Sequence, residues 1–94
     1  MFYLFDRNKK SNKRQGLGVQ LWTDGSKYEG MWSEGQCNGK GRMTHANGDI
    51  YEGEWLNDKA HGFGTFLDAN GAKYTGEWIN DLQHGYGDES WGNG

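Results

Sequence analysis

The stretch YEGEWLNDKAHGFG, residues 51–64, decides the fold, because two close copies of it flank it. Residues 28–41 read YEGMWSEGQCNGKG and residues 74–87 read YTGEWINDLQHGYG, and the opening tyrosines of the three copies are 23 residues apart. Fifteen of the seventeen glycines fall on only four positions of this period, which composition bias alone does not produce. A fixed period in this range is the mark of stacked structural repeats.

The period divides the chain of 94 residues, long enough for one domain at most, into a basic arm and an array. Residues 1–15 form the arm, which we interpret as a degenerate half-repeat or a disordered segment. Phe5 echoes the opening tyrosine, but Arg7 and Lys9 stand where the other copies have Gly and Trp. The array, residues 16–94, consists of a half copy, two full copies and an incomplete copy: 16–27, 28–50, 51–73 and 74–94.

Each copy begins with a pattern that is typical of a half-buried strand. Tyr51, Gly53 and Trp55 alternate with Glu52 and Glu54. Alternation with a period of two places the aromatic rings on one face of a strand and the carboxylates on the other. The carboxylates therefore lie toward water and keep the array soluble.

The rest of the copy predicts a hairpin. Residues 57–62 read as a polar turn with a glycine at its exit, and residues 63–68 read as a second short strand. Asn70-Gly71 is a strong tight-turn dipeptide that leads into the next copy. Apolar side chains occur at both odd-numbered and even-numbered residues of the second strand, so the sequence does not decide which of its two faces is buried. The sequence predicts an all-β, elongated single-sheet solenoid of antiparallel β-hairpins with a 23-residue repeat.

The glycines at the centre of each strand explain why the motif is repeated. Gly53, and Gly64 on the partner strand, carry no Cβ, so rings from neighbouring hairpins can lie across the backbone. An isolated hairpin is marginal in water, and stacking turns isolated rings into a continuous core. We expect the aromatic face to serve first as core and second as a contact surface; it consists of Tyr28, Trp32, Tyr51, Trp55, Tyr74, Trp78, Tyr86 and Trp91.

Charge is distributed unevenly along the chain. Residues 1–15 hold five Lys or Arg and one Asp, whereas residues 16–94 hold five basic and twelve acidic residues. The acidic array repels phosphate, so we expect no binding to nucleic acid. The arm can attract anionic lipid, although a solvated N-terminus is the preferred interpretation. The residues that would contact lipid are Lys9, Lys10, Lys13 and Arg14.

The sequence offers no catalytic or metal-binding constellation. His61 and His84 recur at one position of the repeat because the repeat recurs, and we interpret them as polar turn residues. The pairs Glu52 with Glu54, and Asp88 with Glu89, lack the cleft that paired catalytic carboxylates need. No nucleophile stands beside a base. We therefore expect no enzyme activity, no catalytic residue, no cofactor and no metal site.

The single cysteine and the terminal segments bear on location. Cys37 has no second cysteine with which to form an internal disulfide, and we interpret it as a small residue in a turn. No apolar run is long enough to span a bilayer, and the opening MFYLF is too short for a signal peptide. We expect a cytoplasmic protein that is associated with the cytoskeleton or a membrane.

These motifs closely resemble the MORN (membrane occupation and recognition nexus) repeat family. Its pattern is Tyr-x-Gly-x-Trp, a polar turn ending in Gly, then Gly-x-Gly and finally Asx-Gly. The match covers residues 16–94 and fails for residues 1–15. The resemblance implies a twisted row of antiparallel hairpins, and it implies association roles, namely protein scaffolding, self-association and phospholipid binding.

The two ends of the array predict one mode of association. Arg7 and Lys9 place charge at the N-terminal edge, and charge protects an edge strand from pairing. The strand at residues 86–91 lacks a following Tyr-x-Gly-x-Trp motif. If the 94 residues are the whole molecule, we expect two chains to meet there around a two-fold axis; in a fragment of a longer array, the same surface awaits the next repeat. Asp88 and Glu89 oppose this dimer, because like charges meet across the axis.

We expect a non-catalytic scaffold module that binds a protein, either another copy of the chain or a segment laid along the aromatic groove. The alternative is a peripheral membrane adaptor that binds anionic phospholipids through the basic arm. The acidic array disfavours the alternative, because it repels an anionic surface.

Overall fold

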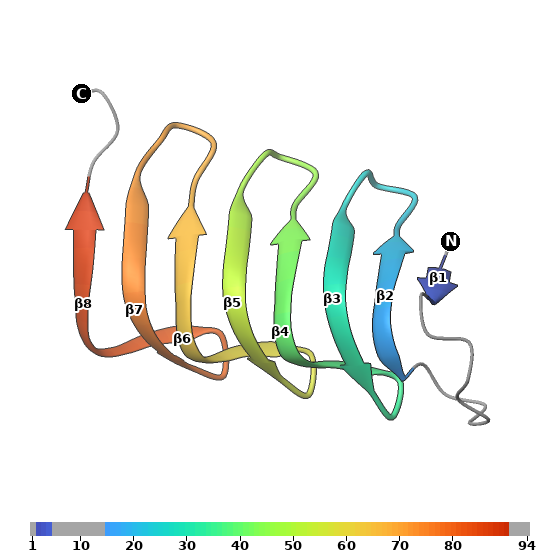
Figure 1. The fold of residues 1–94 in the computed structure, drawn as a ribbon. Coiled ribbons are helices and arrows are strands. Elements are labelled where there is room, and N and C mark those ends of the chain that lie inside the picture. The colour runs from blue at the N-terminus through green and yellow to red at the C-terminus, as the bar shows by residue number, and fades with distance from the viewer. Residues whose placement is uncertain (1, 5–14, 91–94) are drawn as a thin grey trace.

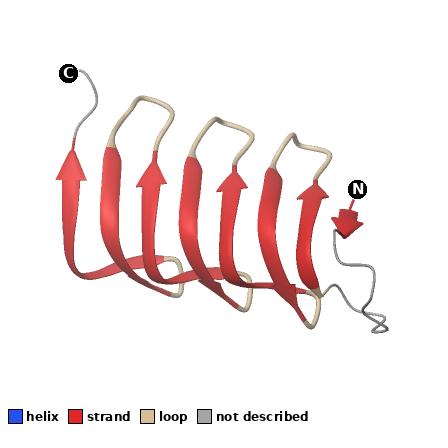
Figure 2. Ribbon diagram, viewed as in Figure 1, coloured by secondary structure: helices blue, strands red, loops and turns tan. Residues whose placement is uncertain are grey.

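The computed structural model of the chain describes residues 2–4 and 15–90, with side chains from residue 15 onward except that of Tyr86 (Figure 1). Across these residues the protein consists of strands and loops (Figure 2). Eight strands form one open antiparallel sheet in sequence order, and the molecule measures 48 × 28 × 16 Å. The strands are β1 (Phe2–Leu4), β2 (Gly16–Leu21), β3 (Lys27–Ser33), β4 (Gln36–Thr44), β5 (Ile50–Leu56), β6 (Lys59–Leu67), β7 (Lys73–Ile79) and β8 (Leu82–Ser90). The predicted all-β row of hairpins is confirmed.

A row of glycines crosses the sheet and fixes its register. From β2 to β8, each strand places one glycine directly opposite a glycine of the next strand: Gly18, Gly30, Gly41, Gly53, Gly64, Gly76 and Gly87. The row is needed because the backbones approach closely there. A Cβ at Gly53 would collide with the Cα of Gly64, and a Cβ at Gly64 would collide with the ring of Tyr51.

The turn within each copy is shorter than the sequence predicts. Leu56 pairs with Lys59, so only Asn57 and Asp58 form the turn, with φ of 49° and 72°. Two-residue hairpins of this kind need positive φ at both central residues, which Asn and Asp tolerate better than most residues do. The predicted six-residue polar turn is therefore wrong, and its last residues belong to β6.

The glycine at residue 62 has a different role from the predicted turn exit. Gly62 has a φ of 88° and lies where the pairing of β5 with β6 shifts register between Gly53 and Trp55. This is a β-bulge, which bends a strand and leaves ladder groups unpaired. The carboxylate of Glu54 accepts a hydrogen bond from the N–H of Phe63 at 2.6 Å and so satisfies one of them.

The turn at Asn70-Gly71 is confirmed, within a five-residue connection between Leu67 and Lys73. The N–H of Gly71 donates to the carbonyl of Asp68 at 3.0 Å. The carboxylate of Asp68 accepts from the N–H groups of residues 70 and 72 at 2.8 and 3.0 Å. The side chain of Asp68 thus stabilises the connection by accepting hydrogen bonds from its backbone.

The structure also shows which face of the second strands is buried. Ala60 and Phe66 of β6 lie on the same face as the aromatic rings, whereas Phe63 is 61% exposed on the opposite face. The core consists of a single layer of side chains along that face: Tyr28, Trp32, Cys37, Tyr51, Trp55, Ala60, Tyr74 and Trp78.

The first hairpin has a register that the 23-residue alignment does not predict. Phe2 of β1 pairs with Gln20, and Leu4 pairs with Gly18. Phe2 and Leu4 therefore stand where the later copies have the tyrosine and the glycine of their motif. We predicted Phe5 at the tyrosine place, and the pairing gives that place to Phe2, three residues earlier. The connection from β1 to β2 is longer than in the other hairpins, so the repeat period does not apply to it.

Candidate functional site

The predicted aromatic face is the interior of the array. Its described rings are between 0% and 8% exposed, from Tyr28 at the low end to Trp55 at the high end. The remaining predicted members are not placed: the side chain of Tyr86 and the whole of Trp91 lie outside the described residues. As a contact surface, the described rings therefore offer a partner little area unless the array opens.

The rings form one continuous ladder. Tyr28, Tyr51 and Tyr74 each meet the tryptophan of their own copy edge to face. Tyr28 and Tyr51 also meet the tryptophan of the following copy. Tyr51, for example, lies 5.0 Å from Trp55 and 5.3 Å from Trp78, measured between ring centroids. Edge-to-face pairs contribute beyond the area that they bury. The ladder therefore couples each copy to the next.

The polar atoms of the rings are all satisfied by backbone carbonyls in the pattern of the repeat. The hydroxyl of Tyr51 donates to the carbonyl of Glu54 at 2.8 Å within the same copy. The indole N–H of Trp78 donates to the carbonyl of Gly64 in the preceding copy at 3.1 Å. We predicted that rings of neighbouring hairpins lie across Gly64. The ring over it is that of Tyr51 from the same copy, while the neighbour's indole reaches its carbonyl.

A second contact joins the copies at their turns. The carboxylate of Asp58 accepts from the N–H of Cys37 at 2.7 Å, and the N–H of Asp58 donates back to the carbonyl of Cys37 at 3.0 Å. Asp81 makes the same two contacts with Ala60, at 2.7 and 2.9 Å. The turn of each of these copies therefore forms hydrogen bonds with the backbone at the start of the second strand in the copy before it.

Cys37 is buried in β4 and not in a turn, which corrects the interpretation made from the sequence. Burial, followed by the charge of Asp58, raises the pKa of its thiol from 9.0 to about 12. Burial likewise raises the pKa of Tyr28 above its usual range, and it raises the pKa of Tyr51 to about 12. The thiol is thus protonated and covered at neutral pH, which makes it unreactive.

A groove of about 810 Å³ opens on the aromatic side of the sheet. Apolar side chains line most of it: Met43, Tyr51, Trp55, Phe66, Trp78 and Leu82. Asp58, Asp81, His45 and Gln83 add polar groups. Leu82 is 71% exposed, so the wall that it forms is open to a partner.

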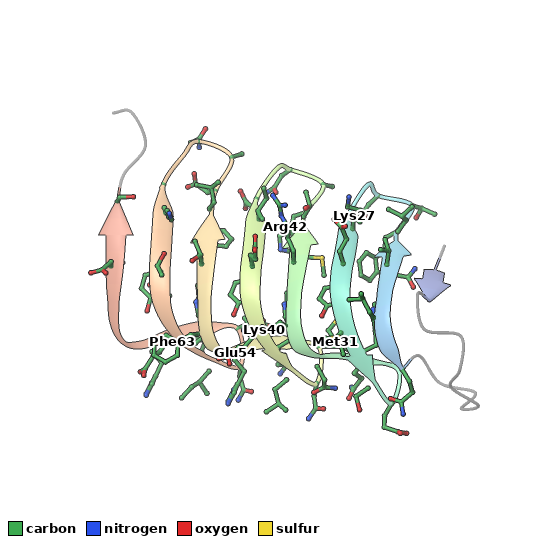
Figure 3. The ribbon with its side chains drawn as sticks, in the orientation of Figure 1. Lys27, Met31, Lys40, Arg42, Glu54 and Phe63 are labelled. Atoms are coloured by element: carbon green, nitrogen blue, oxygen red, sulfur yellow. The ribbon has the colours of Figure 1, made fainter. Side chains whose placement is uncertain are left out.

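The opposite face of the sheet is mixed in charge and carries scattered apolar side chains. Figure 3 shows Met31, Lys40, Glu54 and Phe63 following one another across β3 to β6. A shallow groove of about 600 Å³ runs beside them. Exposed ion pairs join Lys27 to Glu29 at 3.0 Å and Arg42 to Glu52 at 3.8 Å. Such pairs contribute little to stability, and they leave no strong charge of one sign on this face.

The last described strand differs from the strands that precede it. Gln83 and Glu89 stand at the places that Ala60 and Phe66 occupy in the previous copy, and both are exposed. From the sequence we expected this strand to be open for pairing, because no further Tyr-x-Gly-x-Trp motif follows it. Its register shows polar residues at the core-facing places, which suits contact with water.

The histidines and carboxylates do not gather into a metal site. Within residues 2–4 and 15–90, no group of three His, Cys, Asp or Glu side chains could hold a metal ion. His61 and His84 lie in β6 and β8 and not in turns, which corrects their predicted placement. The Nδ1 atom of His61 is buried without a hydrogen-bond partner. No helix in the described part of the chain is long and apolar enough to cross a membrane.

The predicted lipid-contact residues Lys9, Lys10, Lys13 and Arg14 all lie outside the described residues. Their role stays a prediction.

The family model of the MORN repeat matches the chain four times, over residues 8–27, 28–50, 51–73 and 74–94. The last three matches have the bounds of the predicted copies, whereas the first begins at residue 8, within the segment where we expected the match to fail. No curated protein matches the chain.

Proposed function

The chain belongs to the MORN repeat family, and on that premise we propose that it is a non-catalytic interaction module of a protein scaffold. MORN repeats occur in modules that bind proteins or membranes, and the family is in general not catalytic. The groove on the aromatic side is the observation that carries the choice of a protein partner.

The groove suits an extended apolar segment of a protein. Its lining is mostly aromatic and aliphatic, and the exposed Leu82 and the half-buried Phe66 can gain contacts without unfolding the array. Apolar grooves with a few polar groups are typical of binding sites. Asp58 and Asp81 at the groove favour a partner segment that carries positive charge.

A photo-reactive amino acid at position 83 tests this proposal. Gln83 is exposed and lines the groove, so a bound partner should be captured there when the protein is expressed in its own cells. The matched control places the same group at Thr75, on the opposite face. We expect one protein to be captured from position 83 and not from position 75, and Leu82→Asp should abolish the capture. Equal capture from both positions would contradict a role for the groove.

Self-association through β8 is part of the proposal. β8 is the last described strand and pairs on one side with β7, so two copies can meet along its other edge around a two-fold axis. Asp88 and Glu89 of the two copies then face one another, so the dimer should tighten with added salt or lower pH. Light scattering over a concentration series measures this, and a monomer at high concentration and high salt would remove this mode.

A peripheral membrane adaptor is the second candidate, and the basic arm at residues 1–15 is the observation that favours it. The arm carries a net charge of +4 and the array −7, so only the arm can attract anionic lipid. Each cation near such a surface contributes about 1 kcal/mol. Sedimentation with anionic vesicles should therefore disappear when Lys9, Lys10, Lys13 and Arg14 are neutralised. Binding that persists in this variant and in high salt would show that the repeats themselves hold lipid.

We place the module in the cytoplasm, at the cytoskeleton or a membrane, because scaffold and adaptor roles are exerted there. Fluorescence microscopy of the tagged chain tests this.

A further inference from the structure

We propose that the groove on the aromatic side binds a polyproline II segment of a protein partner, one that carries an arginine or a lysine at every third residue. This inference rests on the proposed interaction function, and it names the backbone conformation and the charge pattern of the bound segment. Three features of the groove support it: its direction across the strands, the spacing of its side chains and the charge along one side.

The groove crosses the strands, so its lining repeats with the copies. Its residues come from β4 to β8, and the copies follow one another across the sheet (Figure 1). Met43 and Phe66 form an apolar row, in which each faces the tyrosine of the next copy. Asp58 and Asp81 form an acidic row, in the turns of consecutive copies. A segment that lies along the groove therefore meets one apolar and one acidic side chain per copy.

The tryptophans lie between the apolar row and the acidic row. The ring of Phe66 lies 6.3 Å from that of Trp78, measured between centroids. Toward the turns, Trp55 pairs with Ala60, whose N–H donates to the carboxylate of Asp81. A segment that lies above the tryptophans thus has an apolar wall on one side and carboxylates on the other. The long side chain of arginine or lysine can reach those carboxylates from there.

The acidic row leaves charge available to a partner. Both of its aspartates are exposed, and Asp58 is exposed although a complete hairpin follows it. One oxygen of each carboxylate accepts a backbone N–H of the preceding copy at 2.7 Å, that of Cys37 or of Ala60. The second oxygen of a carboxylate can accept further hydrogen bonds. Among the described residues that line the groove none is Lys or Arg, so the groove favours a basic segment.

The spacing of the copies selects the conformation of the segment. Tyr51 lies 5.0 Å from Trp55 and 5.3 Å from Trp78, which limits the separation of the two indoles to about 10 Å, and two strand spacings amount to about 9.5 Å. A polyproline II helix rises about 9.3 Å in each turn of three residues, so every third residue returns to the same side. A basic side chain at every third residue therefore meets one aspartate per copy.

Other backbone conformations match this spacing less well. A β-strand returns to the same side after two residues, or about 6.7 Å. An α-helix returns to nearly the same side after seven residues, or about 10.5 Å, so it loses about 1 Å of register per copy. Polyproline II segments also dock in aromatic-lined grooves of other proteins, because their conformation is largely formed before binding. The groove thus favours polyproline II over a strand or a helix.

Two synthetic peptides of the same composition test the inference with the full chain as receptor. The probe is four copies of Pro-Pro-Arg, so its arginines are three residues apart. The control is two copies of Pro-Arg-Pro-Pro-Pro-Arg, in which no two arginines are three residues apart. We expect calorimetry to show that the probe binds about fivefold more tightly than the control, the effect of one additional exposed ion pair.

Variants of the acidic row show whether its charge makes this distinction. The double variant Asp58→Asn, Asp81→Asn keeps the oxygens that accept the backbone N–H groups and removes both charges. The two peptides should bind this variant equally. The matched control, Glu29→Gln with Glu52→Gln, removes the same charge from the opposite face and should keep the preference for the probe. Circular dichroism checks that each variant is folded.

Three outcomes would overturn the inference. The first is equal affinity of the parent chain for the two peptides. The second is a preference for the probe that survives in the asparagine variant. The third is tighter binding of an alanine-rich helical peptide with arginines seven residues apart. If none of the peptides binds while the groove still captures a partner at position 83, the proposed function stands and this inference falls.

Discussion

The copy at residues 51–73 and the copy at residues 74–90 fold in the same way but differ in what covers them. Their turns, Asn57-Asp58 and Asn80-Asp81, have nearly the same backbone angles, with φ of 49° and 72° against 49° and 71°. Yet Ala60 of the first copy is 4% exposed, whereas Gln83 at the same place in the second is exposed. The repeat motif therefore determines that each copy folds as a hairpin. Whether the aromatic face of that hairpin is buried depends on the next hairpin along the chain.

This difference follows from the thickness of the molecule. In the described part of the chain the core is one layer of side chains, mostly rings, on one face of a single sheet, with no second sheet over it. Each ring is covered by the rings before and after it. Within the described residues the copy at 74–90 has such a neighbour on one side only, and the polar residues at its core-facing places reduce the apolar surface that it exposes.

The largest expected effect is at the centre of the ladder. Trp55→Ala removes a ring that meets both Tyr28 and Tyr51, and it should lower the free energy of unfolding by about 3–5 kcal/mol. Leu82→Ala, at a side chain 71% exposed, should change it by less than about 0.5 kcal/mol. Urea melts of the two variants make the comparison. Similar losses would mean that the stacked rings are not the core.

The glycine row gives the next effect. A Cβ at Gly64 collides with the ring of Tyr51, which is held between two indoles, so Gly64→Ala should cost about 1–3 kcal/mol. A Cβ at Gly87 collides with Tyr74, which has an indole on one side only and can shift. We expect Gly87→Ala to cost clearly less in thermal melts. An equal cost at both glycines would show that the end copy is as rigid as the inner one.

Alkaline pH should weaken the inner copies. The pKa of Cys37 is raised from 9.0 to about 12 in the folded protein, so the unfolded chain loses this proton first as pH rises. The stabilisation is complete below pH 9 and is lost toward pH 12, by at most about 1.4 kcal/mol per pH unit for this one group. Tyr51 acts in the same direction between pH 10.0 and about 12.

Cys37→Ala tests this effect, because alanine stands at the same place in the next copy as Ala60. The variant should lose less stability than the parent between pH 9 and 12 in urea melts. Parallel curves would show that the thiol does not contribute.

The smallest effect is expected on the mixed face. Arg42 and Glu52 lie 3.8 Å apart with side chains that are 52% and 68% exposed. Arg42→Ala should therefore lower the free energy of unfolding by no more than about 1 kcal/mol. A double-mutant cycle with Glu52→Ala measures the pair itself. A coupling much larger than this would mean that the mixed face contributes to stability as the aromatic face does.

The sequence predicts well those features of the fold that depend on the residues of a single copy. The alternation of Tyr51, Gly53 and Trp55 with two glutamates is enough to predict a strand with an aromatic face. The turn was predicted less well, because Asn57 and Asp58 adopt positive φ that their residue types permit without requiring. Gly62 resembles a turn exit in the sequence, and only the pairing with β5 shows it to be a bulge.

What depends on two copies together could not be predicted. The contact of Asp58 with Cys37 joins residues 21 apart, so it needs the register between hairpins. The β1 strand is displaced by a connection of different length, and the repeat period carries no information about that connection.

Amide hydrogen exchange at Ala60 and Gln83 tests most directly the central claim that each copy is completed by the one after it. The N–H of Ala60 is held by Asp81 at 2.7 Å, whereas Gln83 has the same place in the last described strand and no following turn within the described residues. In a dilute, monomeric sample, NMR should show that Ala60 exchanges at least about tenfold more slowly than Gln83. Equal protection of the two amides in the monomer would contradict the account.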